Sequence, residues 1–210
     1  MNVAVKKMSL ESKDISMKEV LRYMGVRGEL SYLELQEQVD MLLPRFVHEI
    51  NGRACYLQVP VSIHGDTVCM DVLTVKSRHL ATALQGCEKA VLFAATLGGN
   101  VDRMYRSASV NSSISALIID ALGTTAVEAL CDKLCMGFAV EFPEYTVRPR
   151  YSPGYGDLHL STQRDVVRVL DTYKTIGVTL SGSLLMIPQK SVTAIVGLQK
   201  RSNNESKVVL

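Results

Sequence analysis

The pattern of apolar positions in the first quarter of the chain predicts two helices. Ser16 and Glu19 have the spacing of a capping box, which indicates a helix over residues 16–24. Ser31 and Glu34 repeat this spacing before a second helical pattern, so we expect another helix to begin there. The apolar positions of that second helix are Leu35, Val39, Leu42 and Leu43.

Between Arg53 and Val75 the composition changes to β-branched and aromatic residues. Apolar residues stand at nearly alternate positions on both sides of Gly65-Asp66, which predicts a hairpin of two strands. Pro60 lacks the N–H that a central strand needs. We therefore expect the first strand to be an edge strand or to be interrupted at Pro60.

The rest of the chain mixes helical and strand patterns without regular alternation. We expect helices over 77–84, 101–109, 112–136 and 161–170, strands over 89–97, 184–187 and 191–198, and irregular chain over 137–156. Pro188-Gln189-Lys190 predicts the turn between the last two strands. Gly123 in the longest helix marks either close packing or the approach of a ligand. This order favours an α+β fold over a doubly wound parallel sheet.

The two ends of the chain are polar and lack a periodic pattern. We expect a flexible lead-in over residues 1–15 and a flexible tail over 201–210. No repeat or linker divides the remainder, so residues 16–200 are predicted to form a single domain.

The charges are balanced, with 23 Lys and Arg against 21 Asp and Glu in 210 residues. They form no dense basic run, which argues against a nucleic-acid partner. No apolar run approaches the ~18 residues of a membrane span, and the N-terminus lacks a signal-peptide pattern. The sequence therefore predicts a cytoplasmic protein with no membrane partner.

The five cysteines are odd in number and show no CxxC spacing, which is typical of reduced thiols in a core. Cys131 and Cys135 are four residues apart in a predicted helix and could chelate a soft metal from one helix face. No histidine stands at a matching spacing, so core packing is favoured and no metal site is predicted.

Two other motifs are weak evidence for a functional site. Gly98-Gly99 ends a predicted strand and opens a helix, whose free N–H groups could hold an anion. Phosphate-binding motifs are missing there, so a plain turn capped by Asn100 is favoured. Asp157 could orient His159 if the segment is extended, but no nucleophile completes the set. We therefore predict no catalytic residue.

The segment Arg150-Tyr-Ser-Pro-Gly-Tyr155 has the composition of a rigid ligand-binding loop. Pro153 and Gly154 suit a type II turn, which would bring Arg150 and Tyr155 to one side. Arg150 then offers a bidentate donor to a carboxylate, and Tyr155 offers an aromatic face. This combination suits a zwitterionic sulfonium nucleoside such as S-adenosylmethionine. The alternative is a surface turn in which the arginine stacks on the tyrosine.

This loop and two later segments resemble the activation (reactivation) domain of cobalamin-dependent methionine synthase. The segments are Arg150-x-Ser-Pro-Gly-Tyr155, residues 175–188 (TIGVTLSGSLLMIP) and residues 191–197 (SVTAIVG), in matching order and spacing. The resemblance covers about residues 52–197. It implies a single α+β domain, with a twisted and largely antiparallel sheet flanked by helices, that binds S-adenosylmethionine in a shallow groove.

The resemblance also implies roles for individual residues. Arg150 would grip the carboxylate of the ligand, and Tyr155 would lie near its sulfonium. Ser152, Pro153 and Gly154 would form the loop backbone, and Glu144 would supply a carboxylate to the ligand. Thr124 stands where the fused form of the domain can place an acidic contact. The chain also has no Trp, so the aromatic N-terminal segment of the fused form is missing.

The implied function is that of an activation subunit of cobalamin-dependent methionine synthase, acting in trans. Such a subunit supports reductive methylation of cob(II)alamin to methylcobalamin, with S-adenosylmethionine as methyl donor and a flavodoxin-type protein as reductant. The cobalamin is carried by the partner. A chain of 210 residues has no room for the other synthase modules, so we expect a component and not a complete enzyme. The alternative is a non-catalytic docking or regulatory module for a corrinoid protein.

Overall fold

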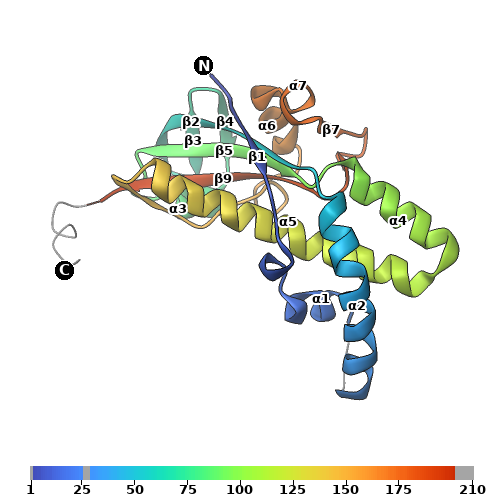
Figure 1. The fold of residues 1–210 in the computed structure, drawn as a ribbon. Coiled ribbons are helices and arrows are strands. Elements are labelled where there is room, and N and C mark those ends of the chain that lie inside the picture. Colours follow the sequence, from blue (N-terminus) through green and yellow to red (C-terminus); the bar gives the residue numbers. More distant parts are fainter. Residues whose placement is uncertain (1, 26–28, 202–210) are drawn as a thin grey trace, which may run out of the picture.

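A seven-stranded antiparallel sheet forms the centre of the computed structural model, which describes residues 2–25 and 29–201 (Figure 1). The strand order is β4-β3-β2-β5-β9-β6, and β1 pairs with β2 outside this path. The strands are β1 (Ala4–Met8), β2 (Gly52–His64), β3 (Thr67–Met70), β4 (Leu73–Lys76), β5 (Lys89–Thr96), β6 (Tyr145–Val147) and β9 (Ser191–Lys200). A separate small sheet joins β7 (Thr179–Leu180) to β8 (Met186–Ile187).

Helices cover both faces of this sheet. They are α1 (Met17–Tyr23), α2 (Glu29–Glu49), α3 (Arg78–Ala83), α4 (Gly99–Asn111), α5 (Ser113–Glu141), α6 (Thr162–Leu170) and α7 (Thr172–Ile176), with a 3-10 turn at Ser12–Asp14. Adjacent residues of β5 point into different cores. Phe93 packs with α1, α2 and α5, whereas Leu92 packs with α3, α6 and α7. The predicted α+β fold, a largely antiparallel sheet flanked by helices, is confirmed.

The long helix α5 is the centre of the first core. Its Phe138 is fully buried, and the ring lies 5.0 Å from that of Tyr56 and 6.2 Å from that of Phe93. An 18-residue window of α5 is apolar enough to span a membrane, with a mean hydropathy of 1.6, but 61% of this window is buried inside the fold. This burial is that of a core helix. In Figure 1, α2 and α4 lie beside its N-terminal half.

Most predicted helix starts are confirmed. Ser16 caps α1 by accepting a hydrogen bond from the N–H of Glu19 (3.4 Å), and Ser77 caps α3 in the same way from Leu80 (3.0 Å). The predicted hairpin at Gly65-Asp66 is confirmed, because β2 pairs with β3 from His64 opposite Thr67. Its second strand is not continuous, because the segment after the turn forms two strands, β3 and β4.

Several helix boundaries also differ from the prediction. The helix α4 runs from Gly99 to Asn111 with Gly98 as its N-cap, so Asn100 lies inside the helix and is not its cap. The helix α2 already includes Glu29, so Ser31 lies inside it and not at its start. The helix α5 continues through Gly137 to Glu141 and does not stop at 136. One glycine costs a helix only about 1 kcal/mol, which the apolar contacts of Phe138 outweigh.

The predicted flexible lead-in over 1–15 is wrong, because residues 4–8 form a strand. β1 pairs with β2 from Ala4 opposite Tyr56 to Met8 opposite Gly52. The sequence does not predict this strand, because Lys6 stands at an inward position where an apolar residue is expected. Its ammonium group reaches the surface and pairs with Glu141 (2.6 Å). Of the predicted tail, residues 202–210 lie outside the described part of the chain.

The strand β2 is not an edge strand, and Pro60 does not interrupt it. The N–H of Val61 donates to the carbonyl of Glu88 on the β5 side (3.1 Å), so the nitrogen of Pro60 faces the other way. On that side the pairing with β1 stops at Tyr56, opposite Ala4, and the pairing with β3 starts at Val61, opposite Met70. On the same side, no strand of the described chain pairs with residues 57–60. The missing N–H of Pro60 therefore breaks no ladder hydrogen bond.

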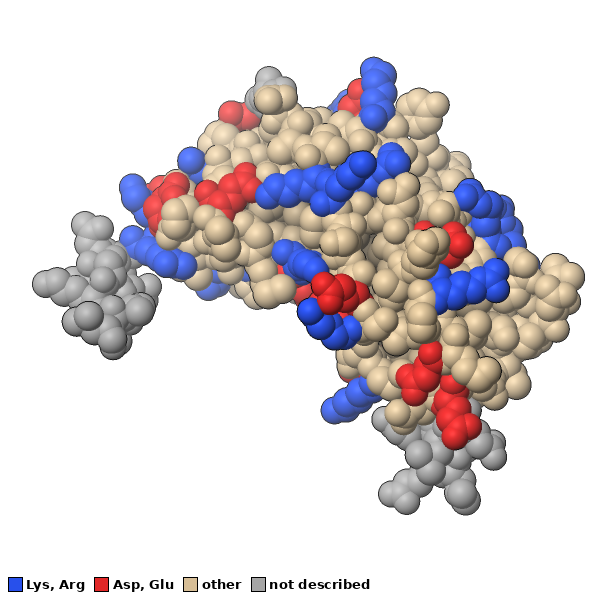
Figure 2. Space-filling view, viewed as in Figure 1, with Lys and Arg blue, Asp and Glu red and all other residues tan. Residues whose placement is uncertain are grey.

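Charged side chains are mixed over the surface. On the face shown in Figure 2, Lys and Arg alternate with Asp and Glu, as the balanced composition predicts.

Candidate functional site

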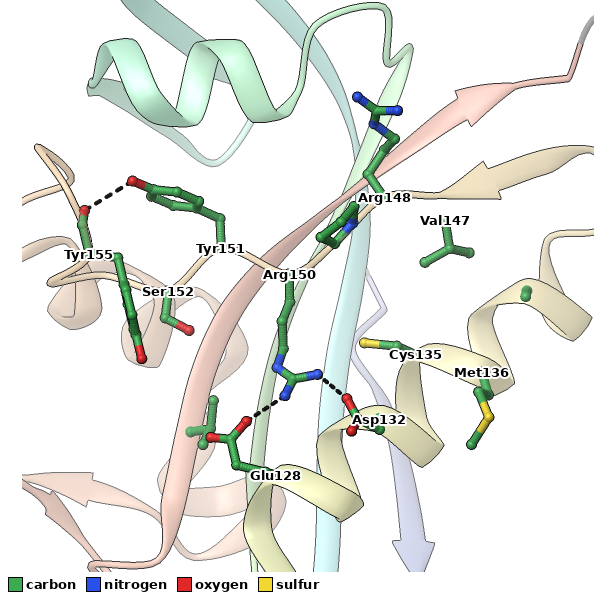
Figure 3. A pocket seen from close by; sticks show the side chains of 13 residues that line it. Glu128, Asp132, Cys135, Met136, Val147, Arg148, Arg150, Tyr151, Ser152 and Tyr155 are labelled. Atoms are coloured by element: carbon green, nitrogen blue, oxygen red, sulfur yellow. Dashed lines mark hydrogen bonds and ion pairs between the residues drawn. The ribbon is translucent and has the colours of Figure 1, made fainter. Parts of the chain in front are cut away.

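An open pocket of about 820 Å³ lies between α5 and the segment that follows β6 (Figure 3). One wall is α5, and the other is the chain from Val147 through Tyr155. The lining residues are Glu128, Asp132, Cys135, Met136 and Ala139 of α5, then Val147, Arg148, Pro149, Arg150, Tyr151, Ser152 and Tyr155, with Val192 of β9. The pocket thus collects residues from three distant parts of the sequence.

Arg150 crosses the pocket to α5, where it pairs with two carboxylates (Figure 3). One guanidinium nitrogen lies 2.5 Å from Oε2 of Glu128, and the other donates to Oδ1 of Asp132. Partial burial lowers the pKa of Arg150, but the hydrogen bonds that it donates to Asp132 and Glu128 outweigh this and raise the pKa overall. The guanidinium is therefore fully charged and held in one orientation.

The predicted turn is present after Arg150. The N–H of Tyr155 donates to the carbonyl of Ser152 (3.2 Å), and Gly154 has the positive φ (+94°) of the third position of a type II turn. Pro153 is buried behind the turn, whereas the side chain of Tyr155 is 69% exposed. Arg150, Ser152 and Tyr155 all line the pocket, and Pro153 and Gly154 shape the loop behind it.

Glu144 lies elsewhere. It is exposed in the turn before β6, its carbonyl accepts the N–H of Arg201 (3.0 Å), and it is not among the described residues that line the pocket. The structure therefore does not bring Glu144 together with Arg150.

Glu128 and Asp132 were missed from the sequence. They are one helical turn apart on an apolar helix, a spacing that places both carboxylates on one face. Thr124, the position that the resemblance suggests for an acidic contact, lies one helical turn before Glu128. Its hydroxyl accepts a hydrogen bond from Lys190 Nζ (2.8 Å).

Gly123 is a site of close packing and not of ligand approach. A Cβ at Gly123 would lie 2.8 Å from Cε of Lys190, whose stem crosses the helix at this point. The ammonium of Lys190 pairs with Asp120 (2.8 Å). Together these contacts hold the turn before β9 against α5.

The ion pairs of Arg150 also form a wall between two cavities. A second cavity of about 360 Å³ shares Arg150, Glu128 and Asp132 with the first. Its other lining residues are Asp14, Ser16, Glu19, Tyr23, Thr125 and Ala129. The two acids on the far side of the arginine already have partners, because Asp14 pairs with Lys133 (3.3 Å) and Glu19 pairs with Arg22 (2.6 Å).

Cys131 and Cys135 lie on α5, as predicted, and both thiols are free. Burial raises the pKa of both, although nearby Arg150 acts in the opposite direction. Both are therefore protonated at neutral pH. Among the described residues, no group of three or more His, Cys, Asp or Glu side chains could hold a metal ion.

Replacing Gly156 with alanine is expected to lower the free energy of unfolding by about 1–3 kcal/mol. Gly156 has a φ of +54°, and a Cβ there would lie 2.2 Å from His79 Nδ1 and 2.5 Å from the hydroxyl of Tyr151. Urea denaturation measures the change. The control is Gly137→Ala in α5, where a Cβ meets no atom within 4 Å. That control is expected to stabilise by about 0.5–1 kcal/mol, and equal effects at the two sites would contradict the packing argument.

Comparison with known proteins gives a likeness of structure. No family model matches the chain, and no curated protein matches it. Among solved structures, the crystal structure of the MetH reactivation domain bound to AdoHcy matches with a TM-score of 0.74 and 15% sequence identity. The match covers 97% of this chain and 80% of that chain. It confirms the resemblance found in the sequence at the level of structure: this chain has the fold of the MetH reactivation domain.

Proposed function

We propose that this protein binds S-adenosylmethionine and acts in trans as an activation subunit of a cobalamin-dependent methionine synthase. The observation that carries the proposal is the placement of Arg150 between Glu128 and Asp132 in a pocket that Tyr155 also lines. A further support is that the solved structure with this fold holds AdoHcy, the demethylated form of this ligand.

The pocket has a complementary group for each part of the ligand. The guanidinium of Arg150 suits the α-carboxylate, because its fork can donate two parallel hydrogen bonds. The carboxylates of Glu128 and Asp132 suit the α-ammonium, and the ring of Tyr155 suits the sulfonium or the adenine. A zwitterion can therefore replace the ion pairs of the free protein with equivalent ones.

The cobalamin of the partner would supply the cobalt that accepts the methyl group, and a flavodoxin-type protein would supply the electron. The contribution of this chain is to orient the methyl donor and to shield it from water. We place this function in the cytoplasm, where the five thiols stay reduced.

A non-catalytic docking module for a corrinoid protein is the second candidate. One observation favours it: Glu128 and Asp132 already satisfy Arg150, so a ligand carboxylate has to compete with them. A module that has lost its ligand would keep this closed arrangement.

Isothermal titration of the purified protein tests the proposal. We expect saturable binding of S-adenosylmethionine and of AdoHcy, and at least about tenfold weaker binding of adenosine, which lacks the amino-acid group. Binding of neither ligand at ~1 mM, about −4 kcal/mol, would contradict the proposal. The second candidate is then tested with a synthase that lacks its own reactivation domain: methylcobalamin formed with a reductant supports activation, and binding without methylation supports docking.

A further inference from the structure

The segment 150–158, here called the ligand loop, is attached to the fold at both ends. At its start, Tyr151 exchanges two backbone hydrogen bonds with Ile195 of β9, each 2.8 Å long. Near its end, Leu158 is buried to 2% exposure, and its carbonyl accepts the N–H of Gly154 (2.8 Å). Between these attachments the loop projects toward the pocket.

Asp157 makes a third attachment, to the first turn of α3. Its carboxylate accepts hydrogen bonds from the hydroxyl of Ser77 (2.5 Å), the N–H of Arg78 (2.8 Å) and the N–H of His79 (3.2 Å). The bond from Ser77, followed by those from the two backbone N–H groups, holds the pKa of Asp157 below its usual value. The group is therefore ionised at neutral pH. His79 Nδ1 lies 3.6 Å away, whereas His159, its predicted partner, bonds to Ser161.

The loop and α3 also touch next to this carboxylate. Gly156 lies so close to His79 and to the hydroxyl of Tyr151 that a Cβ would overlap both. Tyr151 in turn donates from its hydroxyl to the carbonyl of Tyr155 (3.2 Å). The carbonyl of Tyr155 is thus bonded to Tyr151, and Asp157, two residues further on, holds the same loop against α3.

The ring of Tyr155 has little support of its own. It is 69% exposed, and the hydrogen bonds of this residue to Ser152, Leu158 and Tyr151 all involve its backbone N–H and carbonyl. The direction of the ring therefore follows the backbone of the loop. Asp157 is not among the described residues that line the pocket.

We propose that Asp157 is a positioning residue that fastens the ligand loop to α3 and so keeps Tyr155 in its place in the pocket beside Arg150. This inference rests on the proposed function for its effect on ligand affinity. The attachment itself can be tested without any ligand.

The test compares the full chain with Asp157→Asn, and with Asp71→Asn as the matched control, an exposed acid between β3 and β4. Amide hydrogen exchange is measured by NMR, and AdoHcy binding by titration. In Asp157→Asn we expect the amides of Gly154, Tyr155 and Leu158 to exchange about tenfold faster, and AdoHcy to bind about five- to tenfold more weakly. Exchange in β5 and β9 should stay unchanged, and the control should match the wild type in every measurement.

Each other outcome has a definite meaning. Unchanged exchange in the loop would overturn the proposal, and so would a uniform rise in β5 and β9, which would indicate general destabilisation. Faster loop exchange with unchanged affinity would also overturn it, provided that Arg150→Ala loses binding. If the wild type binds no AdoHcy, the proposed function fails, while faster exchange confined to the loop would still support the attachment.

Discussion

Replacing Arg150 with alanine is expected to weaken AdoHcy binding by about a hundredfold or more. The change removes the bidentate donor for the ligand carboxylate. It also leaves Glu128 and Asp132 facing the pocket without their cation, so that they repel this carboxylate. Two effects of the same sign therefore add at one position. Isothermal titration with the wild type as reference measures the loss.

The same substitution should hardly change stability. Glu128 and Asp132 keep 45% and 63% of their side-chain surface exposed, and ion pairs of this kind contribute about 1 kcal/mol or less. The matched control is Arg168→Ala, which removes an equal charge from an exposed ion pair with Asp165 on α6. Arg168→Ala should bind AdoHcy like the wild type. Equal losses in the two variants would mean that net charge, and not the fork of Arg150, determines affinity.

Replacing Phe138 with alanine is expected to lower the free energy of unfolding by about 3–5 kcal/mol. The ring is fully buried in α5 and packs against Tyr56, Phe93 and Phe142. Its removal leaves a cavity next to Tyr56 of β2 and Phe93 of β5, two rings that are held in the sheet and cannot move in to close it. Urea denaturation measures the change, and the slope of the transition should stay the same.

Val140 provides the control on the same helix. Its side chain is 82% exposed, so Val140→Ala should change the free energy of unfolding by less than about 0.5 kcal/mol. The pair separates burial from helix propensity, because both variants place alanine in the last turns of α5. A loss at Phe138 no larger than that at Val140 would contradict the place of α5 in the core.

Local chemistry made much of the fold predictable. Ser16, Ser77 and Ser112 each cap the helix that the sequence predicted, because a capping side chain acts on N–H groups only a few residues away. β1 was not predictable in this way. Its pairing partner lies near Tyr56, about fifty positions further on, and a five-residue strand with two lysines carries no apolar signal of its own.

The candidate site also has one part that local sequence predicts and one part that depends on contacts between distant residues. The turn at Pro153-Gly154 follows from the conformations of these two residues, so the loop could be predicted. The acids of α5 could not be assigned, because that helix is apolar on nearly every side and its pattern does not reveal which face meets the loop. Only the folded chain shows that Glu128 and Asp132, and not Thr124, stand opposite Arg150.

Pro60 has a consequence for how this protein behaves at high concentration. Residues 57–60 of β2 leave a row of backbone groups open between β1 and β3, and such a row invites a strand from another molecule to add itself. Pro60 offers no N–H there, and its exposed ring stands where an incoming strand would have to lie. The missing donor therefore disfavours the addition of a further strand along this stretch of β2.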